Sequence, residues 1–204
     1  MINTFISNDC VGARIYQILK KEFNNPFIWS RITYYDFLFL INHYDDNYID
    51  FKNVKIQSGT TNVINIDDKI KPYYRHYVYN SLYKVPTQLK NKSSLDVYYY
   101  KIEEYCLQKY KNRLKRFLKN KSKPIFILNQ KQTLSELGYG ITDDNCLNFL
   151  KLKTQYVKIL ITQNKKFLSK NYKNTYIVLK TSENTCDIAK QVLHIINSNN
   201  ILEK

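Results

Sequence analysis

The C-terminal half of the chain contains three apolar runs of strand length, Ile125-Phe126-Ile127-Leu128, Val157-Lys158-Ile159-Leu160-Ile161 and Tyr176-Ile177-Val178-Leu179. Segments with helical periodicity lie between the first two runs, near 144–155, and after the third, near 184–199. Strands that are apolar almost throughout are typical of parallel sheets, because helices cover both faces of such a sheet. The alternation of strand and helix therefore predicts an α/β fold, a three-layer sandwich with a mostly parallel central sheet.

The N-terminal half begins in the same order, with a buried strand at 2–7 and a helix that Asn8 or Asp9 can cap. The apolar positions of this helix recur as far as Phe23, before Asn24-Asn25-Pro26. We expect further elements as follows: a helix at 34–44, short strands at 54–56, 63–66 and 77–79, and a long helix at about 95–121. No repeat and no linker rich in Pro, Gly or Ser interrupts the chain, so we expect a single α/β domain over 1–204.

Composition narrows the function mainly by exclusion. The chain has 204 residues, of which 44% are hydrophobic, so it can build a sizeable core. It has only four glycines, and their positions cannot form a G-x-G-x-x-G or Walker loop. The glycine-rich phosphate cradles of common nucleotide-binding proteins are therefore excluded.

The formal net charge of +15 comes mostly from lysine in a chain also rich in Asn, Ile and Tyr. Such a composition is typical of an AT-rich genome, so we assign most lysines to solvated faces. No recognisable nucleic-acid motif accompanies the charge, and we expect no specific nucleic acid partner. Three scattered histidines provide no metal-ligand spacing, and we expect no metal.

Four well-separated cysteines, without a C-x-x-C pair or a compact disulfide framework, indicate a reducing compartment. The first residues lack the basic flank and cleavage site of a secretory signal, and no apolar run approaches the length of a membrane span. We expect a cytoplasmic protein, either free or peripheral to the inner face of the membrane.

Cys10 is the leading candidate for chemistry. It follows the first strand and stands in the first turn of the next helix, at the sheet edge where ligands bind in α/β proteins. A helix N-terminus favours thiolate over thiol, and Arg14 lies four residues on, on the same face. Gly12 leaves room for a ligand or another backbone. The alternative is that Cys10 packs in the core, as free cysteines often do.

A thiol nucleophile usually needs a base, and His76 is the best of the three histidines. His194 falls on the apolar side of the last helix. His43 ends the second helix, where a histidine interacts favourably with the helix dipole and needs no catalytic role. Cys106 belongs to an apolar helical stripe. Cys146 and Cys186 stay open as candidates only because they stand near helix starts.

The segment 109–118 has no acidic residue and places Lys109, Arg113 and Arg116 on one helical face. These three side chains could clamp a pyrophosphate or an anionic sugar. A solvated basic face is the simpler alternative.

Three segments together resemble the opening of an uncharacterised bacterial exopolysaccharide-biosynthesis family. They are Ser7–Tyr16, which begins Ser-Asn-Asp-Cys-Val-Gly, Asn24–Ile28 and Tyr35–Phe37. Arg75-His76-Tyr77 is similar to that family's His-Tyr element. Glu103-Glu104 with 109–116 is similar to its Glu-Glu to Arg-x-x-Arg helix. The order of Cys, His and Arg-x-x-Arg-Phe also resembles a group of papain-like cysteine peptidases, and the strand-Asn-Cys-helix opening resembles capsule acetyltransferases that bind coenzyme A.

The resemblance covers roughly residues 4–130 and implies an enzyme of surface-polysaccharide biosynthesis. We expect acyl transfer in which Cys10 is the nucleophile and His76 the base, with acyl-coenzyme A as donor and a nascent glycan or glycolipid as acceptor. Backbone N–H groups from Asn8 to Val11 would form the oxyanion site. Substrate or phosphate binding is expected at the following positions: Asn8, Asp9, Gly12, Arg14, Arg75, Lys109, Arg113 and Arg116. The alternatives are a papain-like cysteine hydrolase and a non-catalytic basic module that binds glycan or nucleic acid.

Overall fold

The computed structural model describes residues 3–45, 48–57, 63–71, 95–119, 123–130 and 140–201. Four parallel strands form the central sheet in the order β1-β4-β5-β6: β1 (Thr4–Ser7), β4 (Pro124–Asn129), β5 (Val157–Thr162) and β6 (Thr175–Leu179). The helices are α1 (Val11–Ile18), α2 (Tyr34–Asn42), α4 (Leu95–Lys119), α5 (Asp143–Lys151), the short η3 (Lys165–Ser169) and α6 (Thr185–Ser198). A separate antiparallel pair consists of β2 (Val54–Gln57) and β3 (Val63–Ile66).

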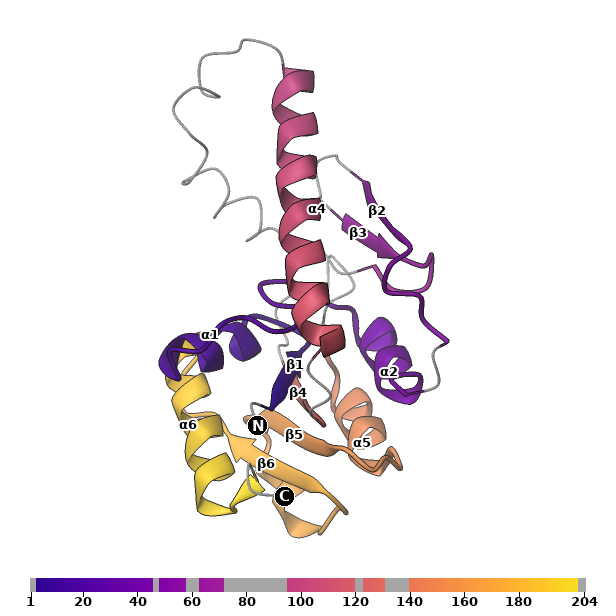
Figure 1. Ribbon diagram of the computed structural model, residues 1–204. Helices are drawn as coiled ribbons and strands as arrows, with labels where there is room; N and C mark the ends of the chain where they lie inside the picture. The colour runs from indigo at the N-terminus through magenta and orange to yellow at the C-terminus, as the bar shows by residue number, and fades with distance from the viewer. Residues whose placement is uncertain are drawn as a thin grey trace.

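Helices cover both faces of the sheet (Figure 1). On one face α1 and α6 pack against each other. On the other face lie α2 and α5, where the ring centroids of Phe37 and Phe149 are 6.2 Å apart and Phe37 also meets Phe126 of β4. The predicted three-layer α/β sandwich with a parallel central sheet is therefore confirmed.

The sheet is buried where the apolar runs predict it. Every residue of β1 and of β4 is buried, and Phe126 and Ile159 are fully enclosed. Burial of a side chain of this size stabilises the fold by about 1.5–3 kcal/mol. The continuous apolar character of these strands thus reflects helices packed on both sides.

The outer edge of β1 is closed by side chains. The Phe5 N–H donates to the Tyr16 hydroxyl at 3.1 Å, and the Phe5 carbonyl accepts from Asn25 Nδ2 at 3.0 Å. Further along, the Ile32 N–H donates to the Asn8 carbonyl at 2.9 Å. The outward backbone groups of Phe5 are thus satisfied within the chain, which disfavours pairing with another strand at this position.

The longest helix, α4, extends well away from the sheet at its N-terminal part (Figure 1). Its C-terminal part is anchored by Tyr110, Leu114 and Phe117, which are buried. The Tyr110 hydroxyl donates to the carbonyl of Phe51 at 3.1 Å. No helix within the described ranges is long and apolar enough to cross a membrane.

Two predicted helices end earlier than the apolar pattern suggests. α1 stops at Ile18 instead of continuing to Phe23, because Lys20 adopts a left-handed backbone conformation with φ 51°. α5 stops at Lys151, where the buried Lys158 Nζ donates to three carbonyls of its last turn, at 2.7–2.9 Å. The strands predicted at 54–56 and 63–66 are confirmed, and the one predicted at 77–79 lies outside the described residues.

Candidate active site

Cys10 lies between β1 and α1, at the carboxyl edge of the sheet. It is the N-cap residue of α1 and thus stands one position before the first turn in which the sequence placed it. Its carbonyl accepts the Arg14 N–H at 3.1 Å, and its side chain is half-buried against the core. The thiol therefore belongs to the tight turn that links strand and helix.

Asp9 holds this turn together. Its Oδ1 accepts the Ser7 hydroxyl and the Val11 N–H, both at 3.0 Å, and so satisfies the N–H of the first residue of α1. Its Oδ2 accepts Asn129 Nδ2 from β4 at 2.8 Å. The carboxylate is only 5% exposed. The N-cap position of α1 is therefore Cys10, and not Asn8 or Asp9 as the sequence predicted, and both Asp9 oxygens already accept hydrogen bonds from the protein.

Asn8 continues the sheet beyond the end of β1. Its side-chain Oδ1 accepts the Asn129 N–H at 2.8 Å, and its Nδ2 donates to the Asn129 carbonyl at 3.2 Å. This reciprocal pair imitates one rung of a β ladder. The Asn8 side chain is therefore used for structure, and it is buried.

The predicted oxyanion site is largely occupied by the protein itself. The N–H groups of Asn8, Asp9 and Val11 donate to the Ile127 carbonyl, the Ser7 hydroxyl and the Asp9 carboxylate, respectively. Donors engaged in this way cannot also face a developing oxyanion in the same arrangement. The expectation that these three N–H groups stabilise a transition state is corrected accordingly.

Gly12 serves close packing of α1 on β1. A Cβ at this position would lie 3.2 Å from the Ser7 Cβ and 3.3 Å from the Phe5 carbonyl oxygen. The sequence predicts that Gly12 leaves room for either a ligand or another backbone. The structure shows the second: β1 approaches closely, and no space is left there for a ligand.

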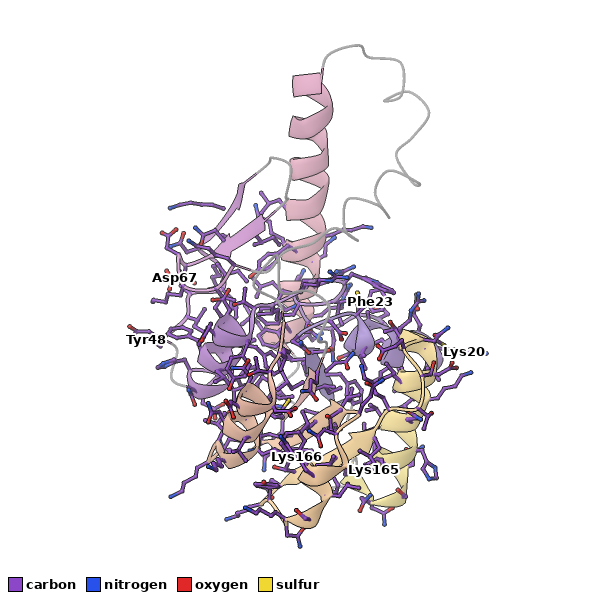
Figure 2. The ribbon with its side chains drawn as sticks, turned by 180° about the vertical axis from the view of Figure 1, so that it is seen from behind. Lys20, Phe23, Tyr48, Asp67, Lys165 and Lys166 are labelled. Carbon is purple, nitrogen blue, oxygen red and sulfur yellow. The ribbon has the colours of Figure 1, made fainter. Side chains whose placement is uncertain are left out.

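Two arginines predicted to bind substrate flank an aromatic pair. The Arg14 guanidinium lies 5.0 Å from the Trp29 ring centroid and donates to Gln17, whereas Arg113 lies 5.2 Å from the Phe23 ring. The rings of Phe23 and Trp29 meet edge to face at 6.2 Å. Figure 2 shows Phe23 close to the C-terminal end of α4. This stack joins α1 to α4 through the loop that follows α1.

The proposed basic clamp on α4 is directed at this same loop. Arg113 donates to the Ile28 carbonyl at 3.0 Å and is 7% exposed, and Arg116 donates to the Phe23 carbonyl at 2.8 Å. The two residues share a face, as the spacing predicts. The buried Arg113 acts as a structural contact instead of a surface clamp, while Lys109 and Arg116 stay half-buried.

Cys146, Cys186 and His194 differ in how far their side chains are buried. Cys146 is fully buried, and burial raises the pKa of its thiol to about 12, which excludes an activated nucleophile there. Cys186 is half-buried in the first turn of α6, and His194 is exposed on that helix. The predicted base His76, with Arg75, lies outside the described residues.

Sequence reasoning missed a second polar network at the same edge of the sheet. Gln130, just after β4, accepts the Thr162 hydroxyl and donates to Asp143 at 2.8 Å. Asp143 also accepts from Asn164 and Lys166, and its hydrogen bond with Lys166 lowers the pKa of the carboxyl. The missed signal was a polar residue directly after each buried strand.

Asn129 is the residue common to the Cys10 turn and the end of β4. It is fully buried, and its Oδ1 has no hydrogen-bond partner among the residues that the structure describes, although its Nδ2 and both backbone groups are paired. A buried acceptor without a donor is energetically costly. The amide oxygen of Asn129 therefore lies beside the turn that carries Cys10 without a donor from the described part of the chain.

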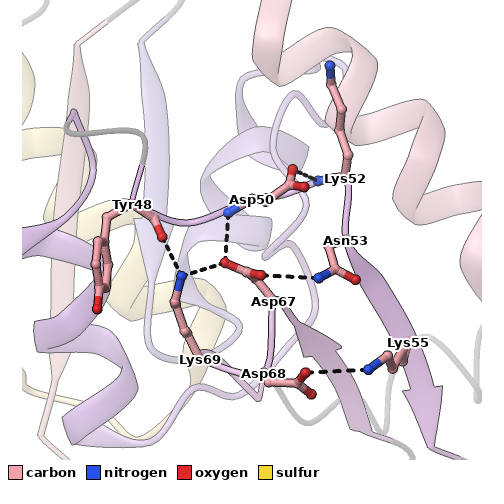
Figure 3. A network of polar contacts seen from close by, with 8 residues as sticks. All are labelled: Tyr48, Asp50, Lys52, Asn53, Lys55, Asp67, Asp68 and Lys69. Carbon is pink, nitrogen blue, oxygen red and sulfur yellow. Dashed lines mark hydrogen bonds and ion pairs between the residues drawn. The ribbon is translucent and has the colours of Figure 1, made fainter.

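The acidic turn after β3 forms a network of hydrogen bonds and ion pairs (Figure 3). Asp67 accepts from the Asp50 N–H, from Asn53 Nδ2 and from Lys69 Nζ, and the Lys69 hydrogen bond lowers the pKa of the Asp67 carboxyl. Lys69 also lies 4.3 Å from the Tyr48 ring centroid. Within the described parts of the chain, no group of three or more His, Cys, Asp or Glu side chains could hold a metal ion.

A scan against models of known protein families and a search of curated proteins find no match for this chain.

Proposed function

We propose that this protein is a thiol-dependent acyltransferase in which Cys10 carries the acyl group. The observation that supports this proposal is the half-buried Cys10 thiol, held at the start of α1 on the carboxyl edge of the sheet. Cys146, a thiol in the first turn of α5, is buried, and burial raises its pKa.

The turn that carries Cys10 is held from several sides. Asp9 ties Ser7 and Val11 together, and Asn129 fixes Asp9 from the neighbouring strand. A nucleophile held by hydrogen bonds on rigid elements needs little reorganisation before attack. This organisation favours a catalytic role for Cys10 over that of a surface thiol without function.

The reaction has two steps. The Cys10 thiolate attacks the thioester carbonyl of acyl-coenzyme A, and a base, for which His76 is the candidate, takes the thiol proton. The carbon–sulfur bond to coenzyme A breaks, and the departing sulfur receives that proton. A hydroxyl of the acceptor then attacks the Cys10 thioester and gives its proton to the base, which returns it to Cys10 as the ester leaves.

The donor and the acceptor rest on the family resemblance of the N-terminal segments. That resemblance suggests coenzyme A as the carrier and a glycan or glycolipid of the cell surface as the acceptor. Arg14, Lys109 and Arg116 keep part of their surface exposed and are the candidates for phosphate contact. Arg113 is withdrawn from this set because it is buried on the Ile28 carbonyl.

The test is incubation with acetyl-coenzyme A followed by mass spectrometry of the intact protein and of its peptides. We expect one acetyl group, bound to Cys10, which hydroxylamine removes. Cys10→Ala abolishes the adduct and Cys186→Ala, the matched control, keeps it. Absence of an adduct at Cys10, together with no effect of coenzyme A on the melting temperature, would refute the proposal.

The same experiment separates the alternatives. A cysteine hydrolase releases free acetate without an acceptor and works on substrates that lack coenzyme A. A non-catalytic basic module forms no adduct, and its affinity for glycan or nucleic acid is unchanged in Cys10→Ala and falls with added salt.

A further inference from the structure

The C-terminal half of α4 and the residues after it carry a dense run of positive charge. Between positions 107 and 123 a Lys or Arg stands at almost every second position, and the sequence has no Asp or Glu there. Elsewhere, several exposed lysines are paired with a nearby carboxylate, such as Lys166 with Asp143 at 2.7 Å and Lys190 with Asp187 at 3.8 Å. The segment itself therefore provides no acidic side chain that could neutralise its charge.

The arginines and the lysines of α4 point in different directions. Arg113 and Arg116 donate to backbone carbonyls of the loop after α1, at 3.0 and 2.8 Å. Lys111, Lys115 and Lys119 are exposed and recur every four residues, which places them on one side of the helix. Within the part of the chain that the structure describes, none of these three lysines forms an ion pair.

An exposed leucine lies among these lysines. Leu118 is 49% exposed and follows Lys115 by three residues, so it shares the outward side of α4. The other side of the helix packs on the rest of the chain through Tyr110 and Phe117, which are buried. We call the outward surface the lysine face, and it consists of Lys111, Lys115, Leu118 and Lys119.

We propose that the lysine face docks on an anionic lipid bilayer and holds the protein at the membrane surface. An ammonium group is a compact point charge that needs no fixed geometry, whereas a planar guanidinium suits bidentate contacts with a phosphate. On α4 the guanidinium groups of Arg113 and Arg116 bind backbone carbonyls, and the ammonium groups are left at the surface. This division is complementary in charge to a diffuse layer of anionic headgroups.

The exposed leucine favours a bilayer over a nucleic acid as the partner. A helix at a membrane interface places aliphatic side chains below the headgroups, while the flanking lysines stay at headgroup level. Proteins that hold single-stranded nucleic acid use aromatic rings on which bases stack, together with arginine. The lysine face contains lysine and leucine, and neither an aromatic ring nor an arginine belongs to it.

The charge of the face also sets the expected strength of binding and its dependence on salt. Near an anionic leaflet each lysine strengthens binding about fivefold, so the three lysines together contribute on the order of 100-fold. Because the attraction acts only within a Debye length, binding should weaken as the ionic strength rises. Vesicles without anionic lipid should bind little protein.

The test is co-sedimentation of the full chain with vesicles made of equal parts of phosphatidylcholine and phosphatidylglycerol, and with vesicles of phosphatidylcholine alone. We expect binding to the anionic vesicles only. Substituting glutamine for all three lysines of the lysine face should weaken this binding on the order of 100-fold. A matched control lowers the net charge by the same amount at exposed positions outside α4 and should change binding by less than about fivefold. This control is the triple substitution Lys151→Gln, Lys153→Gln and Lys173→Gln.

Leu118→Ala distinguishes a bilayer from another anionic partner. We expect this substitution to weaken vesicle binding at least about threefold, because the leucine no longer enters the interface, and to leave binding of a single-stranded oligonucleotide unchanged. The assay does not measure acyl transfer, so its outcome is independent of the role proposed for Cys10.

Four results would overturn the proposal. They are no binding to anionic vesicles, an equal loss in the two glutamine triples, unchanged vesicle binding in Leu118→Ala, and binding of the oligonucleotide through the lysine face without binding of vesicles.

Discussion

Asn129 at the end of β4 donates its side-chain amide to the carboxylate of Asp9 over 2.8 Å and so joins two residues that are 120 positions apart in the sequence. The same Asn129 pairs through its backbone with the Asn8 side chain. The turn that presents Cys10 is therefore not a local structure. Its geometry depends on the adjacent strand, which the chain reaches only after α4.

Replacing Asn129 by alanine should destabilise the protein. The change removes the donor to Asp9 Oδ2 and leaves one oxygen of a buried carboxylate unpaired. We expect the free energy of unfolding to fall by about 1–3 kcal/mol in urea titrations. Asn171→Ala, at an exposed position, is the control and should change it by less than about 0.5 kcal/mol. Equal effects of the two substitutions would show that the Asp9 contact contributes nothing.

Arg113→Ala should also act on stability, because the guanidinium is buried, donates to the Ile28 carbonyl and lies over the Phe23 ring. We expect a loss of about 2–4 kcal/mol in the free energy of unfolding. Arg14→Ala, whose guanidinium is partly exposed, should cost less than about 1 kcal/mol. If Arg113→Ala instead folds with unchanged stability and loses ligand affinity, the residue is a ligand clamp after all.

Alkylation should distinguish Cys146 from the half-buried thiols. Burial makes Cys146 inaccessible and raises its pKa to about 12, so its thiolate is scarce near neutral pH. Iodoacetamide at about pH 8 should label Cys10 and Cys186 in the native protein and reach Cys146 only after unfolding in urea. Peptide mass spectrometry reads this directly. Rapid native labelling of Cys146 would contradict the packing described for α5.

Lys158 should make stability depend on pH in the alkaline range. Burial lowers the pKa of its ammonium from 10.5 to about 8, although three backbone carbonyls accept hydrogen bonds from it. Between these two values the unfolded chain binds a proton that the folded chain has lost, so this group makes the fold more stable as the pH rises. The contribution is at most about 1.4 kcal/mol per pH unit.

The measurement is urea unfolding of the wild type and of Lys158→Met across this range. The other titrating groups are the same in both proteins, so the difference in free energy of unfolding isolates Lys158. This difference should shift in favour of the wild type as the pH rises from about 8 to 10. A flat difference would mean that Lys158 keeps its ordinary pKa.

The strand and helix order of the chain could be predicted from local patterns because β4, β5 and β6 each contain a run of apolar residues over most of their length. Ile125–Leu128, Val157–Ile161 and Tyr176–Leu179 all lie within β4, β5 and β6. The ends of helices were less predictable. Lys20 ends α1 through its backbone conformation, and Lys158, a residue of the next strand, satisfies the last turn of α5.

The roles of the polar residues could not be derived from spacing. Arg113 and Arg116 share a face as the helical period requires, but only the fold brings the loop after α1 under them. Asn8 and Asp9 stand at the expected edge of the sheet, and their polar atoms are used by Asn129. A pattern shows which residues are neighbours on one element, not which partner a second element supplies.

By itself, the sequence determined the class of the fold, the parallel sheet and the position of Cys10 after the first strand, because hydrophobic periodicity and strand order are local properties. Only the tertiary structure decided that Arg113 is structural, that Cys146 is buried and that Asn129 holds the Cys10 turn. These outcomes depend on contacts between segments far apart in the chain, where burial and hydrogen-bond partners are set by packing.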